Sequence, residues 1–331
     1  MKPKTYLNTL SRAVAVLCVL FLMGCIKIKE DNTKCGIIVR FKYDKNVDYV
    51  NKFATRVQRI ELHIFDANGR FMESHSAQAN PFLPEDFEFK LTHILPGNYT
   101  LVAWGNVSNA FNVTPLVVEI PAPTQFNAST LDLIVESGGI ARRTENLSLY
   151  HSTIQNLVLK GDVEFSQVVT MDLTKFTNHI EVTAKGLPIG SQPVANMPFS
   201  CFIYSTNGKY NFAGSHLGNE VVTYYPYPVE IVSDDVFVSN FTILRELNNN
   251  VTQSKMVFYD NRGTTPKLLV EIPLVQKMIE IAGDAKNVKN TGDLDRDDVF
   301  IFEIEFQIDP VGTVHVYING WEFAGKKIPI Y

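Results

Sequence analysis

The clearest strand pattern in the chain is the run Val299-Phe300-Ile301-Phe302-Glu303-Ile304-Glu305-Phe306-Gln307-Ile308. Successive side chains of a strand point to opposite faces, so this run presents one apolar row and one polar row. The apolar row consists of Phe300, Phe302, Ile304, Phe306 and Ile308, and the polar row of Glu303, Glu305, Gln307 and Asp309. We therefore expect a long strand with one face on a hydrophobic core.

Short runs of the same kind, separated by turn residues, fill most of the chain. They cover 37–43, 60–64, 70–72, 87–91, 99–104, 116–120, 131–135, 168–173, 179–184, 199–204, 229–232, 237–244, 268–272 and 314–318. Such spacing predicts an all-β protein built of sandwiches rather than alternating strands and helices. One short helix is expected over 273–281, where Leu274, Met278 and Ile281 recur at helical spacing behind Pro273.

The amino terminus has the pattern of an export signal, because basic residues precede an uncharged apolar run over 13–23. That run is too short for a membrane-spanning helix, which needs roughly 20 residues. Gly24-Cys25 follows it and resembles the lipobox of bacterial lipoproteins, which implies cleavage between Gly24 and Cys25 and acylation of the Cys25 sulfur. The alternative is a secretory peptide that merely contains a cysteine.

Residues 26–34 are polar and are expected to form a tether behind the lipid. Within them, Lys29-Glu30-Asp31 resembles the surface-export signal of some Gram-negative lipoproteins, and an ordinary solvated tether explains the same residues equally well. We therefore predict a lipid-anchored protein of the outer membrane that faces the cell surface.

Length and charge limit the organisation and the partners. We divide the chain into a signal peptide (1–24), a lipidated tether (25–34) and two β-sandwich domains (35–160 and 161–331). The net charge of −5 argues against nucleic acid as a partner, because phosphate binding needs clustered lysine and arginine. Cys35 and Cys201 could pair in an oxidising envelope, but they fall in different predicted domains, so we favour two unpaired cysteines and leave the disulfide as the alternative.

Catalytic and cofactor motifs are absent from the sequence, and we expect neither enzyme activity nor a cofactor. Ser215 and His216 are adjacent, but chain neighbours rarely face each other as nucleophile and base. The histidines show no metal-ligand spacing, so we predict no metal site. His63 and His315 fall on polar strand faces and are expected to be solvated.

An acidic run resembles the start of an EF-hand loop and was tested as a calcium site. It consists of Asp293, Asp295, Asp297 and Asp298. Position six of the loop is Asp298 rather than glycine, and position twelve is Ile304 rather than glutamate, so an EF-hand is excluded. An irregular calcium site and a solvated turn stay open, and we favour the turn.

The segment Thr223-Tyr224-Tyr225-Pro226-Tyr227-Pro228 is aromatic and bounded by proline. Exposed tyrosines could stack on sugar rings. We favour the alternative, an extended segment packed on a sandwich edge.

Several pieces of the sequence are informative when taken in order. They are the lipobox at Cys25, the runs 37–43 and 60–69, the segment Leu95-Pro96-Gly97-Asn98-Tyr99-Thr100-Leu101-Val102-Ala103-Trp104-Gly105-Asn106, the region 172–186 and the ending Val316-Tyr317-Ile318-Asn319-Gly320-Trp321. This set resembles one family, the fimbrium-anchoring lipoproteins of type V pili of Gram-negative anaerobes.

The resemblance implies two transthyretin-like sandwiches in tandem. In that family, stalk subunits lose their first strand and accept a terminal strand of the next subunit in the groove that opens. An anchor that keeps its first strand, here 37–43, ends the fibre at the membrane. The segment 314–331 would then be donated to the last stalk subunit, with Ile318, Trp321, Phe323, Ile328 and Ile330 as candidate donor residues. The implied partners are this subunit, outer-membrane lipid and accessory fimbrial subunits.

Two other functions stay open from the sequence. One is a surface lipoprotein that binds glycans for nutrient uptake, with Tyr224, Tyr225 and Tyr227 as its site. The other is a tip or accessory adhesin of the same fimbrium, which should be processed near Arg56 or Arg59 and expose a groove. The processed amino terminus distinguishes the adhesin from the anchor.

Overall fold

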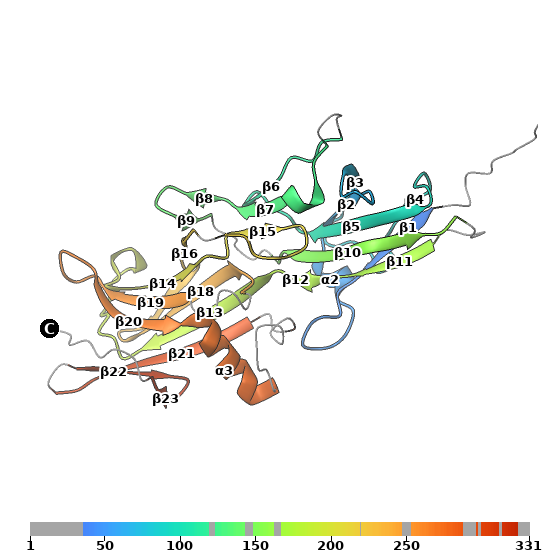
Figure 1. The fold of residues 1–331 in the computed structure, drawn as a ribbon. Helices are drawn as coiled ribbons and strands as arrows, with labels where there is room; N and C mark the ends of the chain where they lie inside the picture. Colours follow the sequence, from blue (N-terminus) through green and yellow to red (C-terminus); the bar gives the residue numbers. More distant parts are fainter. Residues whose placement is uncertain are drawn as a thin grey trace, which may run out of the picture.

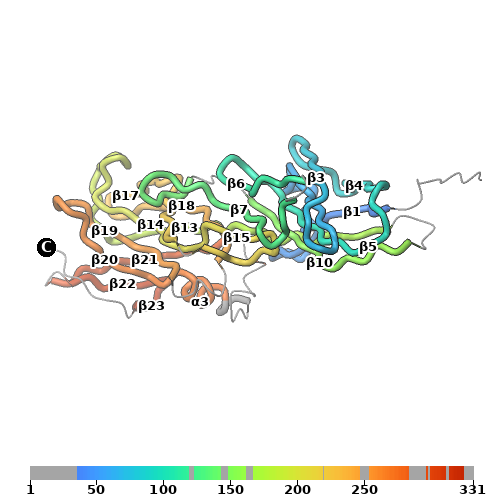
Figure 2. The backbone as a smooth tube through the Cα atoms, turned by 45° about the horizontal axis from the view of Figure 1, so that its top comes forward, coloured from blue at the N-terminus to red at the C-terminus, as the bar shows by residue number. Residues whose placement is uncertain are grey.

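The computed structural model describes residues 36–118, 123–142, 148–161, 167–218, 220–246, 253–286, 296, 299–310 and 313–323. Strands dominate these residues, and the all-β fold class is confirmed (Figure 1). The α-helices among them are α2 (Phe53–Arg56) and α3 (Leu274–Lys286), and short 3-10 turns occur at Phe126–Ala128 and Val194–Asn196. Both views show an elongated molecule with early and late strands at opposite ends (Figures 1 and 2).

Two sheets enclose the first core. One has the order β11 (Gln167–Asp172), β1 (Ile37–Lys42), β4 (Glu88–Leu91). The other has the order β12 (Thr174–Lys175), β10 (Tyr150–Leu159), β5 (Gly97–Gly105), β2 (Arg59–Phe65), β3 (Phe71–Gln78). Alternate residues of β1 and β2 point into this core, as the period of two predicts.

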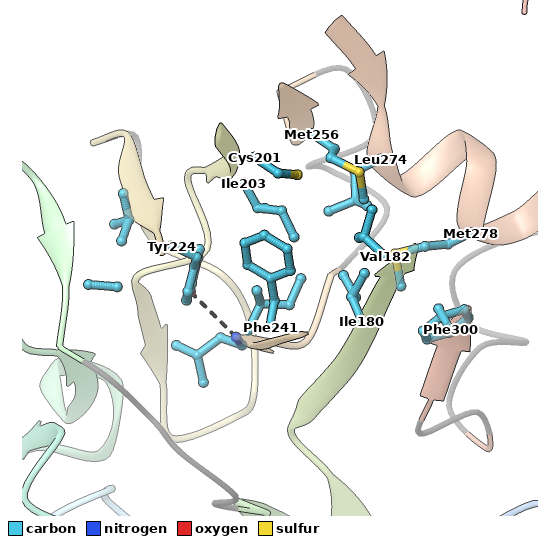
Figure 3. Packing of buried hydrophobic residues seen from close by; sticks show 14 of the residues in the cluster. Ile180, Val182, Cys201, Ile203, Tyr224, Phe241, Met256, Leu274, Met278 and Phe300 are labelled. Carbon is cyan, nitrogen blue, oxygen red and sulfur yellow. Dashed lines mark hydrogen bonds between the residues drawn. The ribbon is translucent and has the colours of Figure 1, made fainter. Parts of the chain in front are cut away.

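Two larger sheets enclose the second core. One has the order β17 (Val229–Ser233), β18 (Val236–Leu244), β13 (Thr177–Lys185), β21 (Val299–Ile308), β22 (Val314–Ile318), β23 (Trp321–Glu322). The other has the order β20 (Lys267–Pro273), β19 (Lys255–Asp260), β14 (Phe199–Ser205), β16 (Val222–Tyr224), β9 (Ile140–Ala141), β8 (Val135–Glu136). Figure 3 shows side chains of β13, β14 and α3 meeting between these layers.

A small fifth sheet links early and late parts of the chain. Its order is β15 (Lys209–Asn211), β7 (Thr130–Leu133), β6 (Phe111–Val113). Its buried side chains belong to the second core. Strand β5 is apolar on both sides, because Leu101 and Ala103 join the first core and Val102 and Trp104 join the second. The two halves therefore share a continuous hydrophobic contact.

The long strand expected over 299–308 forms as β21. Phe300, Phe302, Ile304 and Phe306 are buried, as predicted. The prediction for Ile308 was wrong, because this side chain is 42% exposed. Strand β13 ends opposite Glu305, so Ile308 extends past the partner that covers the rest of the row.

The helix expected over 273–281 forms as α3 and continues to Lys286. Leu274 and Met278 are buried against the second core. The strand expected over 116–120 is absent from its described residues, 116–118. There the Thr124 hydroxyl oxygen accepts a hydrogen bond from the Val117 backbone N–H at 2.9 Å. In a strand this N–H would instead bond to the backbone of a neighbouring strand.

The first core also contains residues from beyond position 160. Strand β11 pairs with β1 in parallel register from Ile37–Gln167 to Lys42–Asp172. Met171 and Leu173 are fully buried in the same core as β1. The division into one domain over 35–160 and another over 161–331 stays a prediction.

Candidate functional site

The first strand lies in the middle of its sheet. Strand β1 pairs with β11 on one side and with β4 on the other. Ile37, Val39 and Phe41 are at most 3% exposed. The predicted lipid-attachment and cleavage residues, Gly24 and Cys25, lie outside the described residues, as does the run at 29–31.

The carboxy-terminal hairpin presents the other candidate attachment surface. Strands β22 and β23 are joined by Asn319 and Gly320, both with positive φ, as a two-residue hairpin turn of type I′ requires. The Asn319 side-chain oxygen accepts the Glu303 backbone N–H at 2.8 Å, and Asn319 N–H donates to the Glu303 carbonyl at 2.8 Å. These bonds fix the turn against β21.

The predicted donor residues fall into three groups. Ile318 is 5% exposed and pairs with Ile304, so it belongs to the chain's own core. Phe323 is half-buried against that core, and Lys277 Nζ lies 5.4 Å from its ring centroid. Trp321 is 78% exposed. Ile328 and Ile330 lie outside the described residues.

A cavity of about 360 Å³ opens between the hairpin and α3. It is lined by Lys277, Glu280, Ile281, Ile318, Asn319 and Trp321. Exposed tryptophans are enriched in protein interfaces, where they bury large areas at low entropic cost. Trp321 at the edge of this cavity is therefore a candidate contact for a protein partner.

The tyrosine segment does not form one cluster. Tyr224 is buried in the second core and donates its hydroxyl to Asn207 Oδ1 at 2.7 Å. Burial raises the pKa of Tyr224 well above its usual value. Tyr225 and Tyr227 are exposed, and Tyr225 packs edge-to-face on Phe202 at 4.7 Å. Tyr224 is therefore excluded from any sugar-stacking surface.

The Ser215-His216 pair has no catalytic geometry. His216 Nε2 bonds to the Thr206 carbonyl, and Ser215 N–H bonds to Asn211 Oδ1 at 2.8 Å. The acidic run at 293–298, which was weighed as a calcium site, lies outside the described residues except for Arg296.

The solvated position expected for His63 was wrong. His63 is 5% exposed because Phe212, from the second half of the chain, covers its ring at 5.4 Å. The prediction assumed that this face of β2 meets solvent. His315 lies between two carboxylates, with Nδ1 3.3 Å from Glu322 and Nε2 3.7 Å from Asp309.

One group that the sequence did not reveal could hold a metal ion. Possible ligand atoms of Glu73, His75 and His93 lie within 4.8 Å of one another. Glu73 and His75 share a face of β3, whereas His93 follows β4. The three residues therefore form no short sequence motif that would predict the group.

Two further observations concern the membrane and the cysteines. In the described part of the chain, neither helix has the length and apolar character needed to span a membrane. Cys201 is a free thiol, and burial raises its pKa well above the usual value. Cys35 lies outside the described residues.

Comparison with known proteins relates this architecture to fimbrial proteins. The Minor fimbrium anchoring subunit Mfa2 of Porphyromonas gingivalis is 25% identical over 230 residues, which cover 68% of this chain and 67% of that protein. The solved structure of the fimbrial anchor protein Mfa2 from Porphyromonas gingivalis superposes with a TM-score of 0.71 at 18% identity, covering 88% of this chain and 100% of that one.

A candidate polysaccharide-binding protein from Bacteroides thetaiotaomicron has the same fold. It superposes with a TM-score of 0.70 at 20% identity and covers 88% of this chain and 98% of its own. Fold alone therefore does not separate these functions. The profile of the family described as fimbrillin-A associated anchor proteins Mfa1 and Mfa2 matches residues 30–324. This chain therefore belongs to the family of fimbrillin-A associated anchor proteins.

Proposed function

We propose that this chain holds a fimbrium to the outer membrane through lipid on Cys25 and limits the length of the fibre. The observation that supports this proposal most is the family match over residues 30–324, which spans both halves of the molecule. Membership of the family associates the chain with the cell envelope and with fimbrial subunits. The lipobox pattern at Gly24-Cys25 supplies the attachment chemistry, since several acyl chains together give stable anchoring.

The position of β1 fits an anchor that keeps its first strand. A subunit that accepts a foreign strand needs a free sheet edge beside an uncovered core face. In this chain β1 fills that place, with buried side chains and hydrogen-bonded neighbours on both sides. As long as β1 is retained, the first core has no room for a strand from another subunit.

The tail after the hairpin is the proposed connection to the stalk. Ile318 is held in its own sheet, so donation would begin beyond it, with Trp321 beside the donated segment. Residues 324–331, which include Ile328 and Ile330, would supply the strand. This assignment makes the exposed Trp321 side chain a contact with the stalk subunit rather than part of the donated strand.

Cys25→Ala is expected to release fibres from the cell. Without the lipid attachment, fibres should appear in the medium instead of on cells, which immunoblotting of the two fractions measures. Cys35→Ala is the matched control and should leave fibres on the cell. Fibres retained by Cys25→Ala cells would contradict the proposal, as would a mature chain that begins downstream of Arg56 or Arg59, since cleavage there removes β1.

Deletion of residues 324–331 is expected to abolish recovery of stalk subunit with the purified anchor. The deletion leaves every residue of β22 and β23 in place, so the thermal unfolding temperature should change little. Trp321→Ala in the full chain should weaken, but not abolish, the same recovery. Undiminished recovery of stalk with the truncated chain would show that the donated strand lies elsewhere.

Glycan binding is the second candidate function, favoured by the exposed Tyr225 and Tyr227. Tyr225 already packs on Phe202, which leaves one face of its ring for a sugar. Binding of the chain to immobilised oligosaccharides, lost in Tyr227→Ala, would support this function over the anchor.

A further inference from the structure

We infer that Glu73, His75 and His93 form a site for a divalent transition metal ion. Their ligand atoms converge: both carboxylate oxygens of Glu73 lie 2.8 Å from His93 Nε2, and one lies 3.4 Å from His75 Nε2. All three ligand groups offer atoms within 4.8 Å of one another. A tetrahedral ion with bonds of about 2.1 Å needs its ligands about 3.4 Å apart, so small side-chain rotations suffice.

The state of His75 is the second observation for this site. Its Nε2 is shielded from solvent and makes no hydrogen bond of good geometry among the described residues, although the Glu73 carboxylate lies 3.4 Å away. The ring is held against Phe89 with centroids 5.8 Å apart. A ring nitrogen that is shielded from solvent and makes no well-formed hydrogen bond loses the bond that it would make to water. A metal ion bonded to this nitrogen removes that cost.

The ligand types select the class of ion. Two imidazole nitrogens with one carboxylate suit Zn²⁺ and similar transition metals, whereas Ca²⁺ and Mg²⁺ prefer oxygen ligands alone. Three protein ligands leave a fourth position for water. The carboxylate also balances part of the charge of the ion.

The position of the site suggests a structural role. Strand β3, which carries Glu73 and His75, is the edge of one sheet of the first sandwich. His93 follows β4, which is the edge of the facing sheet. An ion bound by all three residues would therefore tie the two sheet edges together and stabilise the first half of the molecule.

Titration of the full chain with ZnCl₂ in a calorimeter tests the site. We expect one Zn²⁺ per chain, a higher thermal unfolding temperature with Zn²⁺ than with chelator, and visible absorption when Co²⁺ replaces Zn²⁺. His93→Ala and Glu73→Gln should each weaken binding at least about 100-fold and abolish both the thermal shift and the Co²⁺ absorption.

His315→Ala is the matched control, because His315 has two carboxylates but no second histidine beside it. This variant should bind Zn²⁺ as the unchanged chain does. His93 is mostly exposed, so its replacement leaves the fold intact even where His75→Ala does not. Absence of Zn²⁺ binding to the unchanged chain, or equal binding by His93→Ala and Glu73→Gln, would overturn the inference.

Discussion

Trp104→Ala is expected to lower the free energy of unfolding by about 4 kcal/mol, the range found for large aromatic truncations in cores. Trp104 is 0% exposed and lies where the two halves of the molecule meet. Its ring contacts Phe176 at 5.5 Å and Phe212 at 6.1 Å, both from the second half of the chain. The substitution therefore opens a cavity in the contact that couples the two cores.

Trp321→Ala is the control for this measurement. The chain has two tryptophans, and Trp321 is the exposed one, so its truncation should change stability by less than about 0.5 kcal/mol. Trp104→Phe should cost less than Trp104→Ala, because a ring remains and the indole N–H, which has no partner among the described residues, is removed. Urea denaturation followed by circular dichroism gives all three values. Equal stability of the two alanine variants would contradict a tightly packed junction.

The strands were predictable wherever one face is buried and the other is solvated. Strand β21 is such a case, because its period of two survives along the whole run. Strand β10 was not predicted, because a bulge between Ile154 and Leu157, with Asn156 at positive φ, breaks the alternation. The burial of His63 could not be predicted either, since it depends on Phe212 from a distant part of the chain.

The candidate sites also differ in whether the sequence alone could reveal them. The lipobox at Gly24-Cys25 is a local pattern and can be read without a structure, and its role stays a prediction. The sequence could not predict the group of Glu73, His75 and His93, because it forms where the edges of two different sheets come together. For Tyr224 the sequence suggested a site that the fold does not form. Its aromatic run could have been a sugar-binding surface, but Tyr224 is buried in the core.

Two buried histidines should make the protein sensitive to mild acid. Burial lowers the pKa of His63 from 6.5 to about 4, even though the Glu61 carboxylate lies 3.7 Å from its Nε2. Burial also lowers the pKa of His151 to about 4, helped by the nearby charges of Arg245 and Lys45. The neutral His151 ring is held by a bond of 3.0 Å from Nε2 to the Phe212 carbonyl.

The direction of the effect follows from these shifts. Between pH 6.5 and 4 the unfolded chain binds protons on both histidines while the folded chain does not, so stability falls as the pH falls. Each histidine is expected to cost about 2 kcal/mol at about pH 5, and the two together about 4 kcal/mol. His179, half-buried and with a lowered pKa, adds to the same trend. Glu88 and Asp260 have lowered pKa values and lose their contributions only below the ordinary carboxyl range, outside this window.

Urea denaturation at about pH 7.5 and about pH 5 measures the loss, and variants assign it. His63→Leu removes the titrating ring at a position with no hydrogen-bond partner among the described residues, so it should be nearly neutral at the higher pH and should retain about half of the acid loss. His151→Gln keeps a donor for the Phe212 carbonyl and should also retain about half, while the double variant retains only the part due to His179. His315→Gln, at a partly exposed position outside the two cores, should lose as much stability as the unchanged chain. Only a group whose pKa differs between the folded and unfolded states makes stability depend on pH. If the double variant is as acid-sensitive as the unchanged chain, His63 and His151 are therefore not the groups responsible.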